Sequence, residues 1–268
     1  MQEVTKYPAG TFSWTDLATT DAAGAKQFYT ELMGWTPQDI PMGPDSFYTM
    51  LQLEGRDVAA LSQMGEEQQS QGMPAMWNSY VTVENADESA EKAAALGGTV
   101  MMPPFDVFDS GRMAVIQDPT GAVFSLWQAK SHIGAKFVNI PGTLAWNELM
   151  TTDVARAKSF YSQLFGWETQ TQDMGNGVEY TSIMNNGRSN GGMMQLSKEW
   201  GDVPAHWMVY FSVADCDASV AKAKSLGANI QMPPQDIPEI GRFSVMQDPQ
   251  GAAFTLIQLL HPEPPPAG

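Results

Sequence analysis

Two stretches of the chain carry a tryptophan followed two residues later by an acid. Trp14 precedes Asp16 in "FSWTDLAT", and Trp146 precedes Glu148 in "LAWNELMT". Both stretches alternate like β-strands, and alternation puts residues i and i+2 on one face of a sheet. A carboxyl group on an enclosed aromatic face has a raised pKa, which suits a general acid or base. Glu148, and after it Asp16, are therefore candidate catalytic residues; the alternative is a structural carboxylate bonded to backbone or to a tyrosine.

Histidine is scarce, with His132, His206 and His261 the only examples in the sequence. His206 alone falls on a predicted core strand, so it is the third catalytic candidate, as a ligand or proton carrier for Glu148. The alternative is a histidine stacked at the strand edge beside Trp207.

Arginine follows glycine in "SGR" and "IGR", at Arg112 and Arg242. Each side chain either meets an anionic substrate or forms a salt bridge with an acidic neighbour such as Asp109 or Glu239.

The chain is duplicated, which sets the positions of all these residues. "TFSWTDLATTDAAGAKQFYTELMGW" (residues 11–35) is echoed by residues 143–167 at an offset of 132, and residues 102–128 are echoed by 232–258 at an offset of 130. We expect a first domain at 8–130, a linker at 131–141, a second domain at 142–260 and a disordered proline-rich tail at 261–268.

Within each copy the pattern predicts two β-α-β-β-β units, and therefore an α+β fold. The helices are expected to begin at caps such as Asp21 and Asp87 and to stop at Gly34 and Gly97. "DPTG" and "DPQG" are typical of hairpin turns.

Composition excludes several classes of protein. The formal net charge is −16, which disfavours nucleic acid and anionic lipid as partners. No apolar run approaches the roughly 18 residues that a membrane span needs, and no signal pattern is visible, so we expect a cytoplasmic protein. The single cysteine, Cys216, agrees with a reducing compartment.

These motifs resemble the vicinal oxygen chelate superfamily, which includes glyoxalases, bleomycin resistance proteins and extradiol dioxygenases. The resemblance lies in the "D…FYxxLxGW" opening, the "LGG" helix end and the closing "DPxGxxFxL" strand, and it spans both copies. It implies two tandem domains of curved half-barrels, each forming a cup that in many relatives holds one divalent metal. The cup positions that carry the metal ligands in those relatives correspond here to Trp14, Asn78 and Ser125 in the first copy and to Trp146, Met208 and Thr255 in the second.

None of these six is a strong ligand, so we expect no metal and no other cofactor, with an atypical divalent metal as the alternative. Strand parity instead predicts aromatic and apolar walls suited to a small molecule. The predicted substrate-binding residues are Trp14, Trp146, Asn78, Tyr80, Met113, Ser125, Trp127, Met208, Tyr210, Phe243 and Thr255.

Three functions follow as hypotheses. The first is sequestration of a small hydrophobic or carbonyl compound, in the manner of bleomycin resistance proteins. The second is a glyoxalase-like lyase or isomerase that uses Glu148, and the third is a structural relic with filled cups. Four half-barrel units can close within one chain, so a monomer or weak homodimer is expected. Were the copies to exchange halves, His206 would face Asp16 instead of Glu148.

Overall fold

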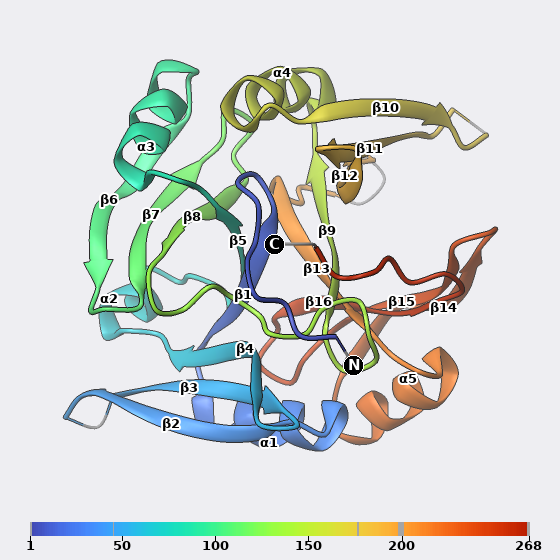
Figure 1. Cartoon of the computed structure of the whole chain (residues 1–268). Coiled ribbons are helices and arrows are strands. Elements are labelled where there is room, and N and C mark those ends of the chain that lie inside the picture. The colour runs from blue at the N-terminus through green and yellow to red at the C-terminus, as the bar shows by residue number, and fades with distance from the viewer. Residues whose placement is uncertain (1, 45, 176, 198–200, 267–268) are drawn as a thin grey trace.

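The computed structural model describes residues 2–44, 46–175, 177–197 and 201–266. Over this part of the chain the strands form two curved eight-stranded sheets, each built from one sequence copy (Figure 1). Their orders are β2-β3-β4-β1-β5-β8-β7-β6 and β10-β11-β12-β9-β13-β16-β15-β14. The expected α+β fold of four βαβββ units is confirmed, and the copies do not exchange halves.

The strands of the first sheet are β1 (Phe12–Thr19), β2 (Thr36–Gly43), β3 (Ser46–Leu53), β4 (Arg56–Gln63), β5 (Met76–Thr82), β6 (Thr99–Val107), β7 (Gly111–Gln117) and β8 (Val123–Ala129). Those of the second are β9 (Leu144–Thr151), β10 (Glu168–Asp173), β11 (Glu179–Asn185), β12 (Arg188–Gln195), β13 (His206–Ser212), β14 (Asn229–Ile237), β15 (Gly241–Gln247) and β16 (Ala253–Leu259). The helices are α1 (Ala22–Met33), α2 (Glu66–Ser70), α3 (Ala86–Ala95), α4 (Val154–Phe165) and α5 (Cys216–Ser225). No helix in the described ranges is long and apolar enough to cross a membrane.

The helix ends follow the sequence signals with one correction. Asp21 caps α1 by accepting from the Gly24 amide, and Gly34 ends the helix with φ 74°. Asp87 is not a cap, because α3 begins one residue earlier and Asn85 accepts from the backbone there. Asp87 instead lies in the first turn, where the helix dipole favours a negative charge.

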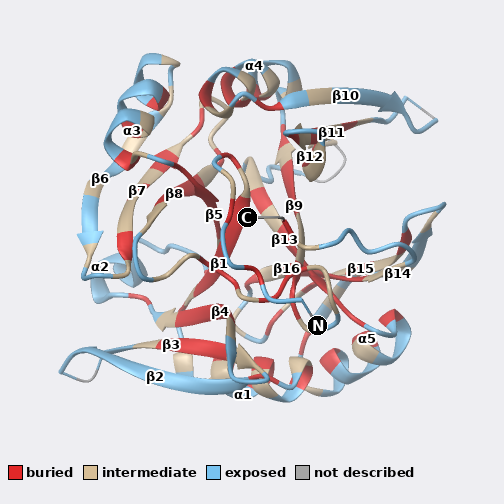
Figure 2. Ribbon diagram, viewed as in Figure 1, coloured by how far each residue is buried: buried red, intermediate tan, exposed pale blue. Residues whose placement is uncertain are grey.

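Burial concentrates on the central strands, and the outermost strands β2, β6, β10 and β14 are largely exposed (Figure 2). Two large apolar clusters join the copies. In one, Phe28 of α1 packs with Phe211 of β13 and Phe254 of β16; in the other, Phe160 of α4 packs with Phe124 of β8. Each copy's first helix is therefore buried against the other copy's sheet.

Two buried hydrogen bonds between the copies form a matched pair. Tyr29 donates to Asp248 at 3.0 Å, and Tyr161 donates to Asp118 at 2.8 Å. The tyrosines belong to the repeated "FY" and the aspartates to the repeated "DPxG" turns. The duplicated motifs thus serve the interface between copies.

The tryptophan of each "GW" also bonds across the interface. Trp35 Nε1 donates to the Gly142 carbonyl, and Trp167 Nε1 donates to the Gly10 carbonyl, both at 2.7 Å. Each indole thereby fixes the segment that enters the opposite copy's first strand.

Candidate functional site

The inner face of the first sheet, here called the N-terminal cup, surrounds Asp16 with hydrogen-bond donors. Tyr80 Oη donates to one carboxyl oxygen at 2.7 Å, and Tyr48 Oη donates to the same oxygen at 3.0 Å. Asn78 Nδ2 donates to the other oxygen at 2.9 Å, and Trp14 Nε1 donates to Tyr48 Oη at 3.0 Å. Pairing of β1 with β5 creates this cluster by setting Trp14 opposite Tyr80 and Asp16 opposite Asn78.

Two segments cover the N-terminal cup, residues 4–9 and 131–138, and together they are called the strap. Tyr7 Oη donates to the Ala135 carbonyl at 2.6 Å, and both residues pack in one apolar cluster with Trp14. The Lys136 amide fastens the strap to β4 by donating to the Asp57 carbonyl at 2.7 Å. Trp14 is consequently only 4% exposed.

His132, placed in the linker by its sequence position, is part of the strap. Its ring lies edge-on to Trp14, with centroids 4.7 Å apart. Nε2 is buried without a hydrogen-bond partner and lies 4.0 Å from an Asp57 carboxyl oxygen. Burial lowers the pKa of this imidazole.

The inner face of the second sheet, the C-terminal cup, repeats the arrangement around Glu148. Tyr210 Oη donates to Glu148 Oε1 at 2.8 Å, and the nearby Tyr180 hydroxyl helps to oppose the rise in the pKa of this carboxyl group. Trp146 Nε1 donates to Tyr180 Oη at 3.0 Å. Met208 lies opposite Glu148, so the amide donor of the N-terminal cup has no counterpart at this position.

Both carboxyl groups titrate abnormally. Burial raises the pKa of Asp16 and of Glu148, and the hydrogen bonds that they accept partly oppose that rise. Burial and the neighbouring acid raise the pKa of Tyr80 and Tyr210 well above the usual value. The tyrosines therefore remain donors, and each acid keeps its proton to a higher pH than an exposed carboxyl group does, which makes it a candidate for proton transfer.

The C-terminal cup is less enclosed than the N-terminal cup. The difference lies at the tryptophan, because Trp146 is half-buried whereas its counterpart Trp14 is buried. Tyr180, Met208 and Phe243 are half-buried, as are their counterparts Tyr48, Asn78 and Met113. The segment that follows β16 is the tail, described here for residues 261–266 without helix or strand. Arg188 of β12 donates to the Pro264 carbonyl and lies 3.9 Å from a Glu263 carboxyl oxygen.

The predicted binding residues collect on the inner faces of the sheets. Pairing of β5, β7 and β8 sets Tyr80 beside Ser125 and Met113 opposite Trp127. In the other cup Tyr210 pairs with Trp146 and with Thr255. Phe243 lies opposite Ile257, on the same face.

His206 lies apart from the carboxyl group that it was expected to assist. It begins β13 opposite Met150, and its Nδ1 is 2.8 Å from the Pro204 carbonyl oxygen. Because the copies do not exchange halves, His206 shares a sheet with Glu148, but Met208 and not His206 pairs directly with Glu148.

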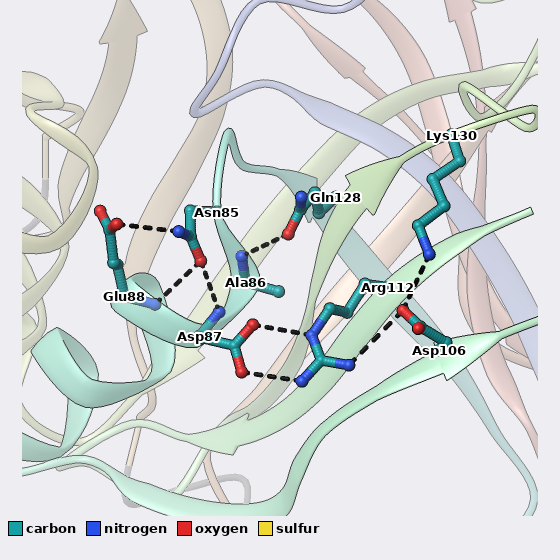
Figure 3. Close-up of polar contacts among 8 residues, drawn as sticks. All are labelled: Asn85, Ala86, Asp87, Glu88, Asp106, Arg112, Gln128 and Lys130. Atoms are coloured by element: carbon teal, nitrogen blue, oxygen red, sulfur yellow. Dashed lines mark hydrogen bonds and ion pairs between the residues drawn. The ribbon is translucent and has the colours of Figure 1, made fainter.

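Arg112 and Arg242 form salt bridges, although not with the expected neighbours. Arg112 forms a two-bond salt bridge with Asp87, at 2.7 and 2.8 Å, and also reaches Asp106 (Figure 3). Arg242 pairs with Asp217 in the same way. The helix start at Ala86 explains the change, because it carries Asp87 to the first turn of α3, beside β7. Both arginine side chains are therefore held in salt bridges away from the cups.

Sequence reasoning missed Tyr48 and Tyr180, whose hydroxyls accept from the tryptophans of the two cups; Tyr48 also donates to Asp16. Their signal was present, since they repeat at the same offset of 132 as Trp14 and Trp146. Alternation along a single strand could not place these tyrosines near the acids, because β3 and β11 do not pair with the strands that carry the acids. Their positions depend on how β3 pairs with β4 and how β11 pairs with β12.

Comparison with known proteins agrees with this architecture. The profile of the Glyoxalase/Bleomycin resistance protein/Dioxygenase superfamily matches residues 11–126 and 134–256. The chain belongs to this superfamily. It is 43% identical over 259 residues to the Mycobacterium tuberculosis protein named "Putative glyoxylase CFP32", covering 96% of this chain and 98% of that one. It is 35% identical over 267 residues to "Anthracycline biosynthesis protein DauV" of Streptomyces sp. (strain C5), covering 96% of both.

Solved structures of superfamily members share the fold. A Mn(II)-bound glyoxalase from Novosphingobium aromaticivorans superposes with a TM-score of 0.65 at 14% identity, over 95% of this chain and 83% of that one. An extradiol ring-cleaving dioxygenase from B. fuscum gives 0.64 at 16% identity, over 99% and 76%. At this identity the likeness concerns the fold alone.

The superfamily's metal does not fit the donors in either cup. The corresponding positions hold indole, thioether, amide and hydroxyl groups. The acids of the described inner faces, Asp16 and Glu148, already accept hydrogen bonds from Tyr80 and Tyr210. Divalent metals in proteins need several imidazole, thiolate or carboxylate ligands. Within the described residues no group of three or more His, Cys, Asp or Glu could hold an ion.

Proposed function

We propose that the protein binds a small, neutral, aromatic or carbonyl compound in the C-terminal cup, without a metal. The observation that carries the proposal is the difference between the cups. The strap packs over Trp14 in the N-terminal cup and buries it, whereas Trp146 remains half-buried beside Glu148 in the C-terminal cup. Large flat side chains with a few polar groups are typical of small-molecule sites.

The chemistry of the lining favours an uncharged ligand. Among the inner-face residues that strand register assigns to this cup, Glu148 is the one acid, and none is a lysine or arginine. These residues are Trp146, Glu148, Tyr180, Ser182, Gly192, Met208, Tyr210, Phe243, Val245, Thr255 and Ile257. Among these described residues an anion would meet no counter-charge. A carbonyl oxygen, by contrast, can accept a hydrogen bond from Tyr210, or from Glu148 whenever that acid carries its proton.

A hydroxyanthraquinone is a suitable first probe, because it is flat and neutral and carries carbonyl oxygens. One relative's name, which refers to anthracycline biosynthesis, supports this choice. Binding should quench tryptophan fluorescence and raise the melting temperature.

A matched pair of variants locates the site. Trp146→Phe should weaken binding of the hydroxyanthraquinone at least tenfold, and Trp14→Phe, in the covered cup, should leave it unchanged. Equal effects of the two variants would refute the assignment, as would no binding to the unaltered protein.

Glu148 supports a second function, proton transfer at a carbon next to a carbonyl group, as in a lyase or isomerase. Its raised pKa suits a general base, and it is the acid of the less enclosed cup. Glu148 would remove the proton to give an enolate and then return it to the same or the neighbouring carbon.

Hydrogen exchange into hydroxyacetone in D2O, followed by NMR, tests this second function. The unaltered protein should catalyse exchange, Glu148→Gln should abolish it, and Asp16→Asn should retain it. Exchange that survives Glu148→Gln would exclude Glu148 as the base.

A further inference from the structure

Gly192 occupies a position where the backbone does not require glycine. Its φ lies outside the left-handed region, unlike that of Gly187 or Gly201. A Cβ built on Gly192 would lie 2.0 Å from Tyr180 Oη and 2.5 Å from its Cζ. Real Cβ atoms do not approach other atoms so closely, so the tyrosine hydroxyl fills the space that any other side chain would need.

The N-terminal cup has alanine at the matching position, Ala60. Ala60 lies beside Asp16 across β1 and β4, as Gly192 lies beside Glu148 across β9 and β12. Because Ala60 has a Cβ, Tyr48 cannot occupy the place that Tyr180 takes over Gly192. The two cups therefore differ at both members of this residue pair. The N-terminal cup has the short acid Asp16 beside Ala60, and the C-terminal cup has the longer acid Glu148 beside Gly192.

The position of Tyr180 matters because its hydroxyl accepts from Trp146 Nε1 at 3.0 Å and lies over Gly192, the residue that pairs with Glu148 across β9 and β12. We propose that Gly192 is the positioning residue of the C-terminal cup: its missing side chain seats the Tyr180 hydroxyl against Trp146 and beside Glu148, and glutamate in place of aspartate matches this seat. In the N-terminal cup, where alanine displaces the tyrosine, the shorter acid Asp16 accepts from Tyr48 at 3.0 Å.

The relevance of Gly192 to ligand binding rests on the proposed function of the C-terminal cup. The test of the positioning role of Gly192 needs no ligand, so failure of one idea is distinguishable from failure of the other. The reporter is the indole N–H resonance of Trp146 in a 1H–15N NMR spectrum, assigned by its loss in Trp146→Phe.

Gly192→Ala should displace Tyr180 and move the Trp146 indole resonance as far as Tyr180→Phe does. Adding Glu148→Asp to Gly192→Ala recreates the pairing of the N-terminal cup and should return the resonance most of the way. Ala60→Gly is the matched control and should leave the Trp146 resonance in place. An unmoved resonance in Gly192→Ala, or no return with Glu148→Asp, would overturn the proposal.

A second measurement covers the case in which Gly192→Ala folds poorly. In a Tyr180→Ala background the Cβ at position 192 meets no hydroxyl or ring. Gly192→Ala should then shift the urea midpoint by less than half of its effect in the unaltered chain. Equal shifts in both backgrounds would show that Tyr180 is not what requires glycine.

Discussion

Replacing Tyr161 by phenylalanine tests whether the repeated motifs hold the copies together. The hydroxyl donates to Asp118 Oδ2 at 2.8 Å and accepts from Trp207 Nε1 at 2.9 Å, and all three side chains are buried. Phenylalanine keeps the ring and its stacking on Trp167, so only the two hydrogen bonds are lost.

The expected cost follows from the groups that the substitution leaves behind. The Trp207 N–H and one Asp118 oxygen lose this partner in a buried setting, and an unsatisfied buried group costs about 1–3 kcal/mol. Asp118 Oδ1 still accepts from the amides of Thr120 and Ala122, which limits the loss at that residue. We expect the free energy of unfolding to fall by about 2–4 kcal/mol.

Urea denaturation, followed by far-UV circular dichroism, measures this loss. For a slope of about 3 kcal/mol/M, the midpoint should fall by roughly 1 M at unchanged slope. Tyr29→Phe is the internal replicate, because Tyr29 makes the same two bonds with Asp248 and Trp77. A loss below about 0.5 kcal/mol in both variants would refute the reasoning.

Three further predictions concern the cups and a helix end. Glu148→Gln should become more stable relative to the unaltered protein as the pH rises above 4.5, because burial raises the pKa of Glu148 in the folded state. Between the unfolded and folded pKa values the unaltered protein loses about 1.4 kcal/mol of stability for each pH unit, and the glutamine variant does not. Urea titrations at several pH values measure this difference. Tyr7→Phe should lower stability by about 1 kcal/mol through loss of the bond to Ala135 and increase acrylamide quenching of Trp14; unchanged quenching would show that the strap does not depend on this bond. Gly34→Ala should cost about 1 kcal/mol in thermal unfolding, because φ is 74° and no neighbouring atom would contact the added methyl group; a neutral effect would contradict this account of the helix stop.

Much of the fold was readable because the duplication repeats each signal. Asp21 and Gly34 bound α1 as predicted, and "FSWTDLAT" is β1 to the residue. Asp87 was misassigned because Asn85 and Asp87 are both residue types that favour capping, and only the backbone shows which one precedes the first helical turn.

The site was less accessible than the fold to sequence reasoning. Alternation along one strand sufficed to place Trp14 with Asp16, since their separation is local. Tyr48 and the strap reach Asp16 and Trp14 through strand pairing and chain reversal, which depend on contacts between distant residues. Gly192 carried no signal in the sequence, because its role lies in the space that it leaves for Tyr180.

The two reciprocal hydrogen bonds between the copies, from Tyr29 to Asp248 and from Tyr161 to Asp118, have a consequence for symmetry. A homodimer of a single copy would make the same two bonds, but both of its cups would necessarily be identical. Joining the copies keeps the twofold pattern at the interface and removes that constraint from the cups. One polypeptide can therefore cover one cup with its own linker and leave a different acid, Glu148, in the other.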